Sequence, residues 1–269
     1  MNTNANDTLS AEIINNKLIT SFIGRNLEIL PTIHSTNLYL KEIDTASINS
    51  GFTVIANEQT GGRGRRGRVF HSPGSQGIYL SILLRPDNTK QDLRLLTICA
   101  AVAVSKAIEK TCNIRAEIKW VNDIFCNGKK ICGILTEATI SGELQEIDTI
   151  IVGIGINTGN VPVEVKDIAT SILETTGMTG IRNQLIAEVL NEFEAVYLDF
   201  TGSNKKQDII DYYTSRLFII GNKVLLPDTD KCHAVTVLGI DNNGALAVKD
   251  EAGDVQHIST GEIMLIKEE

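Results

Sequence analysis

The stretch AEIKWVNDIFCNGKKICGILTEATISGELQEIDTIIVGIGIN, residues 116–157, decides the fold. Asn127-Gly128 is the strongest short hairpin signal in this chain, because both residues tolerate the positive φ of a tight β-turn. It joins a predicted strand at Ala116–Phe125 to a second at Lys129–Ile140. Ser141-Gly142 then turns the chain into a third strand, which ends at Gly153–Asn157. Successive strands joined by tight turns form an antiparallel meander, which predicts an α+β fold rather than a doubly wound parallel sheet.

Helices and strands are predicted on both sides of this meander. The clearest is a helix at Gln91–Lys110, whose apolar residues recur at three- and four-residue spacing. Ser35 suits the N-cap of a shorter helix, because its hydroxyl can accept a hydrogen bond from an unpaired backbone N–H. The other elements are helices at Ser10–Phe22, Ser35–Ile43, Gln184–Asp199 and Lys206–Leu217, and strands at Glu28–Ile33, Phe52–Ala56 and Ile78–Leu84.

From Gly221 onward the sequence changes to short strands separated by turns such as Asn242-Asn243-Gly244. Some 50 residues of this kind are typical of a small β-barrel. We therefore expect one domain over residues 1–217 and a second over residues 218–269. The strands predicted in the second domain are Lys223–Leu226, Ala234–Ile240, Ala245–Lys249, Val255–Ile258 and Ile263–Ile266.

The composition excludes several classes of protein. The chain of 269 residues carries 33 acidic and 25 basic side chains, which gives a formal net charge of −8 and argues against general adhesion to nucleic acid or anionic lipid. Its longest apolar runs fall short of the ~20 residues of a membrane span. Met1–Ser10 lacks the cationic start and apolar stretch of a signal peptide. We expect a cytoplasmic protein that does not bind membranes.

The cysteines indicate no metal site. They are odd in number, widely scattered and without a CxxC pair or a histidine at ligand spacing. Small buried apolar side chains in a reducing compartment are the simplest interpretation. The five are Cys99, Cys112, Cys126, Cys132 and Cys232.

Residues 61–68 read Gly-Gly-Arg-Gly-Arg-Arg-Gly-Arg, which concentrates positive charge on an otherwise anionic chain. Gly62-x-Gly64-x-x-Gly67 matches a dinucleotide fingerprint, but the residues that follow it cannot open the helix which that fingerprint requires. A P-loop fails because Arg68-Val69 stand in place of Lys and Ser/Thr. An arginine–glycine segment for RNA is normally long, repeated and disordered.

A loop that folds over an anionic ligand explains this segment better. Glycine allows close approach of the backbone, and guanidinium groups bind phosphate or carboxylate oxygens in pairs. The alternative interpretation is that these residues form a solvated, charged surface segment with no specific function.

Five blocks, taken in order, make the chain similar to the biotin protein ligases over roughly Ile33–Ile266. One block alone would be a weak match, whereas five in sequence are specific. The blocks are His34-Ser35-Thr36-Asn37, residues 58–68, Lys119-Trp120-Val121-Asn122-Asp123, residues 128–135 and Gly153-Ile154-Gly155-Ile156-Asn157. The resemblance implies a mixed, largely antiparallel sheet flanked by helices, of the class II synthetase type, as a biotin- and ATP-binding catalytic domain, with a small SH3-like C-terminal β-barrel.

The resemblance also implies a reaction. Biotin and magnesium-ATP form biotinyl-5′-adenylate and pyrophosphate, and a lysine of a biotin carboxyl carrier protein, such as that of acetyl-CoA carboxylase, then takes the biotinyl group. ATP and Mg²⁺ are the implied cofactors, and biotin is the substrate. Some relatives form homodimers by sheet extension, so a homodimer is compatible with the sequence. Only 34 residues precede Ser35, with Lys17 and Arg25 as their cations, so we expect the form that does not bind DNA.

Residue roles carry over by position. Arg65 and Lys130 match the catalytic residues, and we assign no metal ligand. The biotin-binding positions are Ser35, Thr36, Asn37, Gln59, Arg63, Gly64, Arg65, Lys130, Gly133, Gly153 and Gly155. The nucleotide-binding positions are Arg65, Arg68, Phe70, Asn122 and Asn157. Phe70 stands where relatives often carry tryptophan, and Val121 replaces a frequent proline.

Two alternative functions remain at this level. A lipoate–protein ligase shares the adenylate chemistry, but lipoate has no ureido ring to match the polar side chains at 35–37 and 59. A small RNA-binding module using Arg63–Arg68 belongs to another class and predicts steep salt dependence without release of pyrophosphate.

Overall fold

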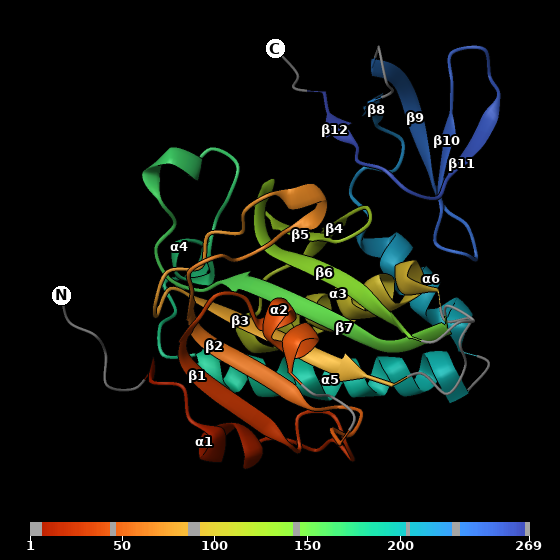
Figure 1. Ribbon diagram of the computed structural model, residues 1–269. Helices are drawn as coiled ribbons and strands as arrows, with labels where there is room; N and C mark the ends of the chain where they lie inside the picture. Colours follow the sequence, from red (N-terminus) through yellow and green to blue (C-terminus); the bar gives the residue numbers. More distant parts are fainter. Residues whose placement is uncertain are drawn as a thin grey trace.

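The computed structural model describes residues 7–43, 47–85, 92–141, 146–202, 205–227 and 232–266. The predicted turn at Ser141-Gly142 lies partly outside these ranges, as does the first residue of the helix expected at Gln91–Lys110. Two β-sheets organise the chain, with a long sheet in the main body and a smaller one at the C-terminal end (Figure 1).

The main sheet is mixed and largely antiparallel. Its first pair, β1 and β2, is parallel, and every other neighbouring pair is antiparallel. In spatial order its strands are β1 (Leu27–Ile33), β2 (Thr53–Gln59), β3 (Gly77–Leu84), β7 (Glu146–Asn157), β6 (Lys129–Ser141), β5 (Asp123–Cys126) and β4 (Glu117–Lys119). The predicted α+β class and the central meander are confirmed.

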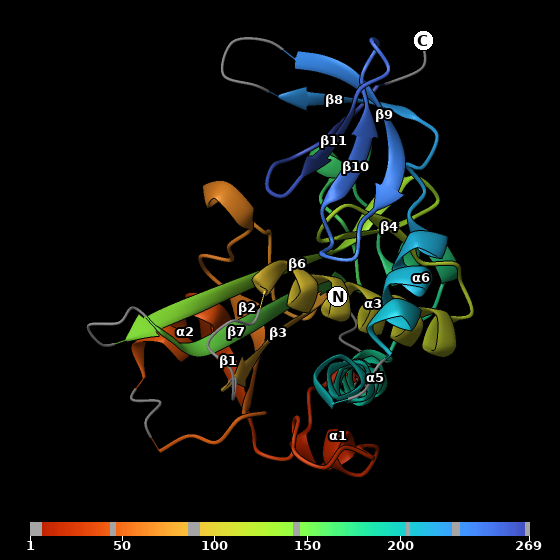
Figure 2. The same ribbon diagram turned by 90° about the vertical axis from the view of Figure 1, so that its right-hand side faces the viewer.

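Strand alternation divides the sheet into two faces with different uses. Ile78, Leu80 and Ile82 of β3 are fully buried on one face, where the helices α3 (Leu93–Cys112) and α5 (Arg182–Gly202) cover them. The helix α6 (Lys206–Arg216) packs on α3 at the same side (Figure 2). No helix within the described ranges is both long and apolar enough to cross a bilayer.

The opposite face is only partly covered. The helix α2 (Thr36–Glu42) packs there through Leu40, which joins Leu83 and Ile151 in a small second core. Because successive side chains of a strand point to opposite faces, Gly153 and Gly155 lie on the α2 side while their isoleucine neighbours point into the main core. The uncovered part of this face is where the site forms.

The helix predicted at Ser10–Phe22 is much shorter than expected. The helix α1 covers only Ala11–Asn15, and the chain beyond it lies in turns. Side chains of α5 satisfy the backbone there: Asn191 accepts a hydrogen bond from Ile19 N, and the Glu194 carboxylate accepts three from Ser21, Phe22 and Ile23 N. The long-range partners on α5 replace the bonds that a continuing helix would have made.

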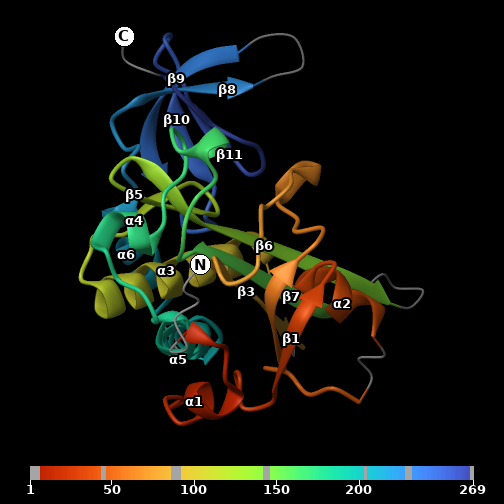
Figure 3. The same ribbon diagram turned by 90° about the vertical axis from the view of Figure 1, so that its left-hand side faces the viewer.

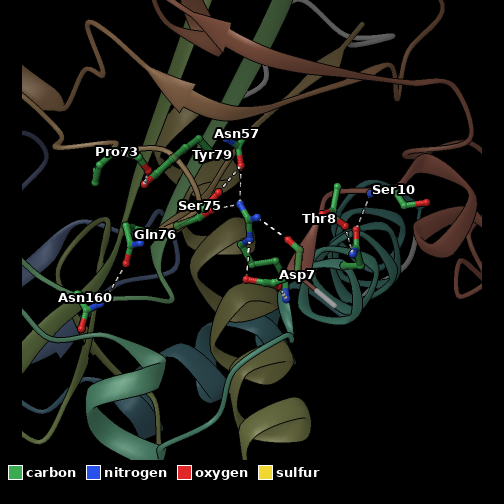
Figure 4. Close-up of polar contacts among 12 residues, drawn as sticks. Asp7, Thr8, Ser10, Asn57, Pro73, Ser75, Gln76, Tyr79 and Asn160 are labelled. Atoms are coloured by element: carbon green, nitrogen blue, oxygen red, sulfur yellow. Dashed lines mark hydrogen bonds and ion pairs between the residues drawn. The ribbon is translucent and has the colours of Figure 1, made fainter. Parts of the chain in front are cut away.

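A buried arginine at the start of α5 fixes the same N-terminal segment. Arg182 is 2% exposed and donates to the carboxylate and the carbonyl of Asp7 and to Asn57 Oδ1 on β2. Asn183 Oδ1 accepts a hydrogen bond from Ser10 N, and Asn183 Nδ2 donates one to Thr8 O. Figure 4 shows Asp7, Thr8 and Ser10 on one side of this cluster and Asn57 on the other. No local sequence pattern pointed to this arginine.

The strand predicted at Ala116–Phe125 is two strands. A turn at residues 120–122, with a cis peptide bond between Trp120 and Val121, separates β4 from β5 and lets Lys119 pair with Asp123. Asn122 closes the turn by exchanging two hydrogen bonds with Ile134 of β6. Because Val121 is apolar and β-branched, the sequence favoured one continuous strand, and the turn was not predicted.

The C-terminal sheet contains the five short strands that the sequence predicts, close to their expected bounds. All its neighbouring strands are antiparallel. Their order is β11 (Val255–Ile258), β10 (Leu246–Lys249), β9 (Cys232–Ile240), β8 (Lys223–Pro227) and β12 (Met264–Leu265). The loop that follows β2 projects toward this sheet (Figure 3), and the short helices η2 (Arg65–Gly67), η3 (Val163–Val165) and α4 (Ile172–Thr176) lie in loops.

The Glu194 contacts predict a specific dependence of stability on acid. Burial raises the pKa of Glu194, but hydrogen bonds from the backbone of Ile23, Phe22 and Ser21 outweigh it and hold the pKa below 4.5. A lowered native pKa contributes stability above 4.5 that is lost as the pH falls through the native value. We expect Glu194→Gln to destabilise the protein by about 1–3 kcal/mol near neutral pH, with the difference narrowing in acid, in urea unfolding at several pH values.

Glu188→Gln is the matched control for this test. Glu188 lies on the same helix but pairs with the exposed Lys110, and such surface pairs contribute about 0–1 kcal/mol. A Glu194→Gln penalty that stays constant from neutral to acid pH would contradict the account.

Candidate active site

Two rows of paired residues form the floor of the site. In the first row, Tyr79 of β3 pairs with Gly155 of β7, Gly155 with Gly133 of β6, Gly133 with Asp123 of β5, and Asp123 with Lys119 of β4. Strand pairing therefore brings these residues into one line on one face of the sheet, although they span 77 positions of the sequence counted from 79 to 155 inclusive. Glycines occupy the middle of the line and leave space above it.

In the second row, Ser81 of β3 pairs with Gly153 of β7, and Gly153 pairs with Leu135 of β6. Between Ser81 and the strand that carries Asp123 lie two further strands, a span of roughly 14 Å. The site therefore has two ends, one at α2 and β3 and the other at β5 and β4.

A cavity of about 630 Å³ lies over this floor. Its wall contains all but one of the site residues predicted from the sequence, namely Ser35, Thr36, Asn37, Gln59, Arg63, Gly64, Arg65, Arg68, Phe70, Asn122, Lys130, Gly133, Gly153 and Gly155. Asn157 is outside the wall, and its side chain donates to Thr170 O. The predicted positions from five distant blocks thus converge on one cavity, with that single exception.

Neutral hydrogen-bonding groups line the end at α2. Gln59 Oε1 accepts hydrogen bonds from Thr36 N at 2.9 Å and Thr36 Oγ1 at 3.1 Å, and Gln59 Nε2 donates to Ser72 Oγ. Ser35 is 3% exposed and occupies the N-cap position of α2, but its hydroxyl makes no capping bond there. The predicted cap is therefore absent, and the Ser35 hydroxyl is not used by the helix.

The side chain of Asn37 is held by the protein on every side. Asn37 Nδ2 donates to Leu135 O and to the Glu137 carboxylate, which also forms an ion pair with Lys41 at 2.6 Å. Burial raises the pKa of Glu137, but hydrogen bonds from Lys41 and Asn37 and the positive charge of Lys41 outweigh it, so the pKa is lowered. A Cβ at Gly153 would lie 2.2 Å from Asn37 Oδ1, which shows that the glycine makes room for this amide.

The other end of the cavity is charged. Lys130 Nζ lies 2.7 Å from Asp123 Oδ1, and Arg65 Nη1 donates to Asn122 Oδ1 at 3.2 Å. Burial, together with the neighbouring Arg66, lowers the pKa of Arg65. Burial also lowers the pKa of Lys119, a cation that the sequence analysis did not select. Several cations facing one cavity favour an anionic ligand.

The loop 61–68 forms a closed hairpin over this end. Arg63 bridges to Val69, and Phe70 N donates to Gly62 O at 2.9 Å. Arg66 has a positive φ of 54°, so the turn itself lies at Arg66 and the glycine after it. The hairpin places Arg65 in the cavity and leaves Arg66 exposed.

The ring of Phe70 lies on the glycine floor. A Cβ at Gly155 would come within 2.6 Å of this ring, and a Cβ at Gly133 within 3.3 Å. The ring also meets Tyr79 edge-on, with 6.4 Å between centroids. From the sequence, these glycines were expected to let a ligand approach the backbone closely. In this structure, side chains of the protein itself pack on them.

The C-terminal sheet completes the wall. Arg68 forms an ion pair with Glu262, and residues 262–266 line the cavity. Trp120 donates from its indole nitrogen to Gly244 O, which joins the β4–β5 turn to the same sheet. Sequence reasoning missed Glu262, because nothing local relates an acidic residue near the C-terminus to an arginine 194 positions earlier.

Asp123, Ser81 and Glu137 were also missed, although the sequence holds signals for the first two. Asp123 lies inside a block that was recognised, and Ser81 is a polar residue in a strand whose neighbours are apolar. Within the described ranges, no group of three or more His, Cys, Asp or Glu side chains could hold a metal ion by itself.

The fold and cavity define a class of enzyme. An antiparallel sheet carries a pocket with a neutral hydrogen-bonding end, an aromatic and glycine floor, and a cationic end. Such a pocket suits a small organic acid bound together with a phosphate-bearing partner.

Comparison with known proteins identifies the family. The family described as "Biotin/lipoate A/B protein ligase family" matches residues 29–157. The bifunctional ligase/repressor BirA of Bacillus subtilis is 35% identical over 261 residues, which cover 96% of this chain and 79% of that protein. The biotin protein ligase of Aquifex aeolicus, solved with biotin and ATP, superposes with a TM-score of 0.77 at 31% identity and covers 91% of this chain and 100% of its own. The chain belongs to the biotin/lipoate protein ligase family.

The biotin–[acetyl-CoA-carboxylase] ligase of Mycobacterium tuberculosis is a further relative, 28% identical over 250 residues. These cover 90% of each of the two chains. This similarity therefore extends well beyond residues 29–157, which the family model matches.

The contact between Phe70 and the floor predicts a coupled effect of mutations. Gly155→Ala forces a methyl group into the Phe70 ring, and we expect a loss of about 1–3 kcal/mol of stability. In a Phe70→Ala background the same substitution should cost much less, because the ring is gone. Urea unfolding of the four proteins of this cycle measures the coupling.

Gly202→Ala serves as the control, since a Cβ at that position has no neighbour within 4 Å among the residues that the structure describes. Equal penalties for Gly155→Ala with and without the Phe70 ring would show that the floor does not seat this side chain.

Proposed function

We propose that the chain is a biotin–protein ligase, which activates biotin as biotinyl-5′-adenylate with ATP and transfers it to a lysine of a biotin carboxyl carrier protein. The observation that carries the proposal is the placement of a neutral polar end and a cationic end in one cavity. The relatives named as biotin ligases, and the similar structure that holds biotin and ATP, support it.

The neutral end suits the ureido ring of biotin. Ser35, Thr36 and Gln59 offer fixed donors and acceptors there, and an unpaired buried polar group costs about 1–3 kcal/mol. Lipoate has no ureido group and would leave these atoms unpaired. The lipoate alternative is therefore not favoured, although the family description covers both acids.

The cationic end suits the reacting groups. The biotin carboxylate attacks the α-phosphorus of ATP, the acyl–phosphate bond forms, and the bond to pyrophosphate breaks. Arg65 and Lys130 offset the repulsion between the carboxylate and the phosphate and stabilise the charge that develops between them. The lysine amine of the carrier then attacks the acyl carbon, AMP leaves with the bonding electrons, and the amine loses a proton.

Asp123 fits the magnesium ion that accompanies ATP. Asp123 Oδ1 is buried and accepts no hydrogen bond from the described residues, although Lys130 lies within ion-pair distance. Mg²⁺ is commonly held by one or two carboxylates together with substrate phosphates. Asp123 would supply the protein carboxylate, and the ion would neutralise phosphate charge when it is bound.

The remaining assignments follow from the same proposal. Phe70 and Asn122 would contact the nucleotide, and Arg63 and Gly64 the biotin chain. We place the domain boundary at 217/218, treat the C-terminal sheet as an SH3-like module, and place the reaction in the cytoplasm with ATP. A homodimer through a sheet edge stays a proposal for sedimentation to test.

The RNA-binding alternative fits the arginines less well. Arg65 and Arg68 are engaged by Asn122 and Glu262 at the cavity, although the Arg68 side chain is largely exposed. In the proposed function these arginines therefore bind a small anionic ligand in the cavity.

The direct test of the first half-reaction is release of pyrophosphate from magnesium-ATP with biotin, lipoate or neither acid. We expect release that depends on biotin and the appearance of biotinyl-5′-adenylate in acid-quenched samples. Release with lipoate but not biotin would contradict the proposal.

Lys130→Ala should slow adenylate formation by roughly 10²-fold or more, because one fixed cation at the developing charge is lost. Lys129→Ala is the matched control: the neighbouring lysine is bonded to Lys166 O outside the cavity and should change the rate less than two-fold. Single-turnover measurements with radiolabelled ATP read the step directly. Equal rates for Lys130→Ala and wild type would remove Lys130 from the mechanism.

Arg65→Ala should release the adenylate before transfer, because the half-buried guanidinium no longer closes the cavity over the intermediate. Arg66→Ala, which removes the exposed neighbour, is its control. Rapid gel filtration after a single turnover separates enzyme-bound from free adenylate. Retention by Arg65→Ala as complete as that of wild type would show that Arg65 does not hold the intermediate.

A further inference from the structure

Ser81 lies behind the neutral end of the cavity. It is fully buried on β3, and it is not part of the cavity wall. Its hydroxyl lies 2.6 Å from Asn37 Oδ1 and 2.7 Å from Thr36 Oγ1, within hydrogen-bond distance of both. Ser81 has a single proton, so it donates to one of these oxygens and accepts from the other; both oxygens belong to the first turn of α2, which Ser81 ties to the sheet.

The orientation of the Asn37 amide follows from its partners. Leu135 O and the Glu137 carboxylate can only accept hydrogen bonds, so Asn37 must present both N–H groups to them. Asn37 Oδ1 therefore faces Ser81, which leaves Ser81 as the donor of that contact. The ion pair of Glu137 with Lys41 keeps the carboxylate ionised and fixes this end of the chain of hydrogen bonds.

A second chain of hydrogen bonds fixes Thr36 from the other side. Ser72 donates its only proton to Phe70 O, so Gln59 must present Nε2 to Ser72 Oγ. Gln59 Oε1 then faces Thr36 and accepts from its backbone N–H and its hydroxyl. The Thr36 proton is thereby used within the protein.

The two chains of hydrogen bonds together determine which donors and acceptors face the cavity. The single hydroxyl proton of Thr36 goes to Gln59 Oε1 or to Ser81 Oγ, both of which lie within hydrogen-bond distance, so toward a ligand Thr36 Oγ1 offers only a lone pair. Gln59 Nε2 keeps one N–H, and the Ser35 hydroxyl has no capping bond. A neutral ring with both N–H donors and a carbonyl acceptor meets these three groups without an unpaired atom.

We propose that Ser81 is a positioning residue that determines specificity, because its hydroxyl, bonded to both Asn37 and Thr36, holds Thr36 as a hydrogen-bond acceptor toward the ligand and selects for the N–H groups of a cyclic urea. This inference rests on the proposed function and extends it to a residue that does not touch the ligand. Loss of the Ser81 hydroxyl would leave Thr36 Oγ1 and Asn37 Oδ1 without the hydrogen-bond partner that they share. The ring-binding end would lose its fixed polarity, while the cationic end roughly 14 Å away would keep its contacts.

The test compares Ser81→Ala with wild type for two acids and for ATP. We expect the calorimetric Kd and the KM for biotin to rise about ten-fold, consistent with loss of a buried hydrogen-bond donor. Binding of desthiobiotin, which keeps the urea and lacks the sulfur, should weaken by the same factor. The KM for ATP should stay within two-fold, because no nucleotide contact depends on Ser81.

Ser105→Ala is the matched control. Ser105 is also a fully buried serine with a hydroxyl bonded to Ala116 O, but it lies on α3 away from the cavity. It should leave all three constants unchanged. Ser81→Cys retains a weak donor of similar size, should fall between alanine and wild type, and carries the test if Ser81→Ala proves unstable.

An unchanged biotin Kd in a folded Ser81→Ala protein would overturn the inference. A KM for ATP that rises as much as that for biotin would also overturn it, since the residue would then only support the fold. Wild-type protein that binds biotin but releases no pyrophosphate would overturn the proposed reaction, while the comparison of biotin Kd values would still decide the role of Ser81.

Discussion

The absence of side chains at three positions in the middle of the sheet is the constraint on which the site depends. Gly133, Gly153 and Gly155 lie side by side on β6 and β7, between the strands that carry Ser81 and Asp123. A larger residue at Gly153 or Gly155 would meet Asn37 or Phe70 at once. The site depends on these glycines, because the side chains of Asn37 and Phe70 that line the cavity pack directly on them.

The other face supports that arrangement. The residues that alternate with these glycines are buried apolar side chains of the main core, namely Cys132, Ile134, Val152, Ile154 and Ile156. Interior β-strands with glycine lose packing and conformational entropy, so the stability must come from elsewhere in the molecule. Here it comes from the apolar face and from the polar clusters at Arg182 and Glu194 that dock the N-terminal segment on α5.

Much of the fold could be predicted, because its signals are local. The Asn127-Gly128 turn and the alternation in the strand that ends at Asn157 are properties of a few neighbouring residues. The segment at Ser10–Phe22 was predicted wrongly, since its backbone partners are on α5, some 170 residues away. The break after Lys119 was missed because Val121 favours a strand where only the tertiary contacts reveal a turn.

The site, like the fold, could be predicted only where its signals are local in the sequence. The residue types in the five blocks led to the cavity wall, but their contacts could not be foreseen from order along the chain. Ser81 and Glu262 act through partners brought near by strand pairing and by the C-terminal sheet. Asn157 was selected with its block, yet its side chain lies outside the cavity wall and bonds to Thr170.

The central claim is that this cavity activates a cyclic-urea acid and passes it to a carrier lysine. Intact mass spectrometry of a purified biotin carrier domain tests it most directly, after incubation with the protein, magnesium-ATP and either biotin, lipoate or no acid. The account predicts a gain of one biotinyl group in the biotin sample alone, and loss of that gain when the acceptor lysine is replaced by arginine. A gain with lipoate and none with biotin would contradict it.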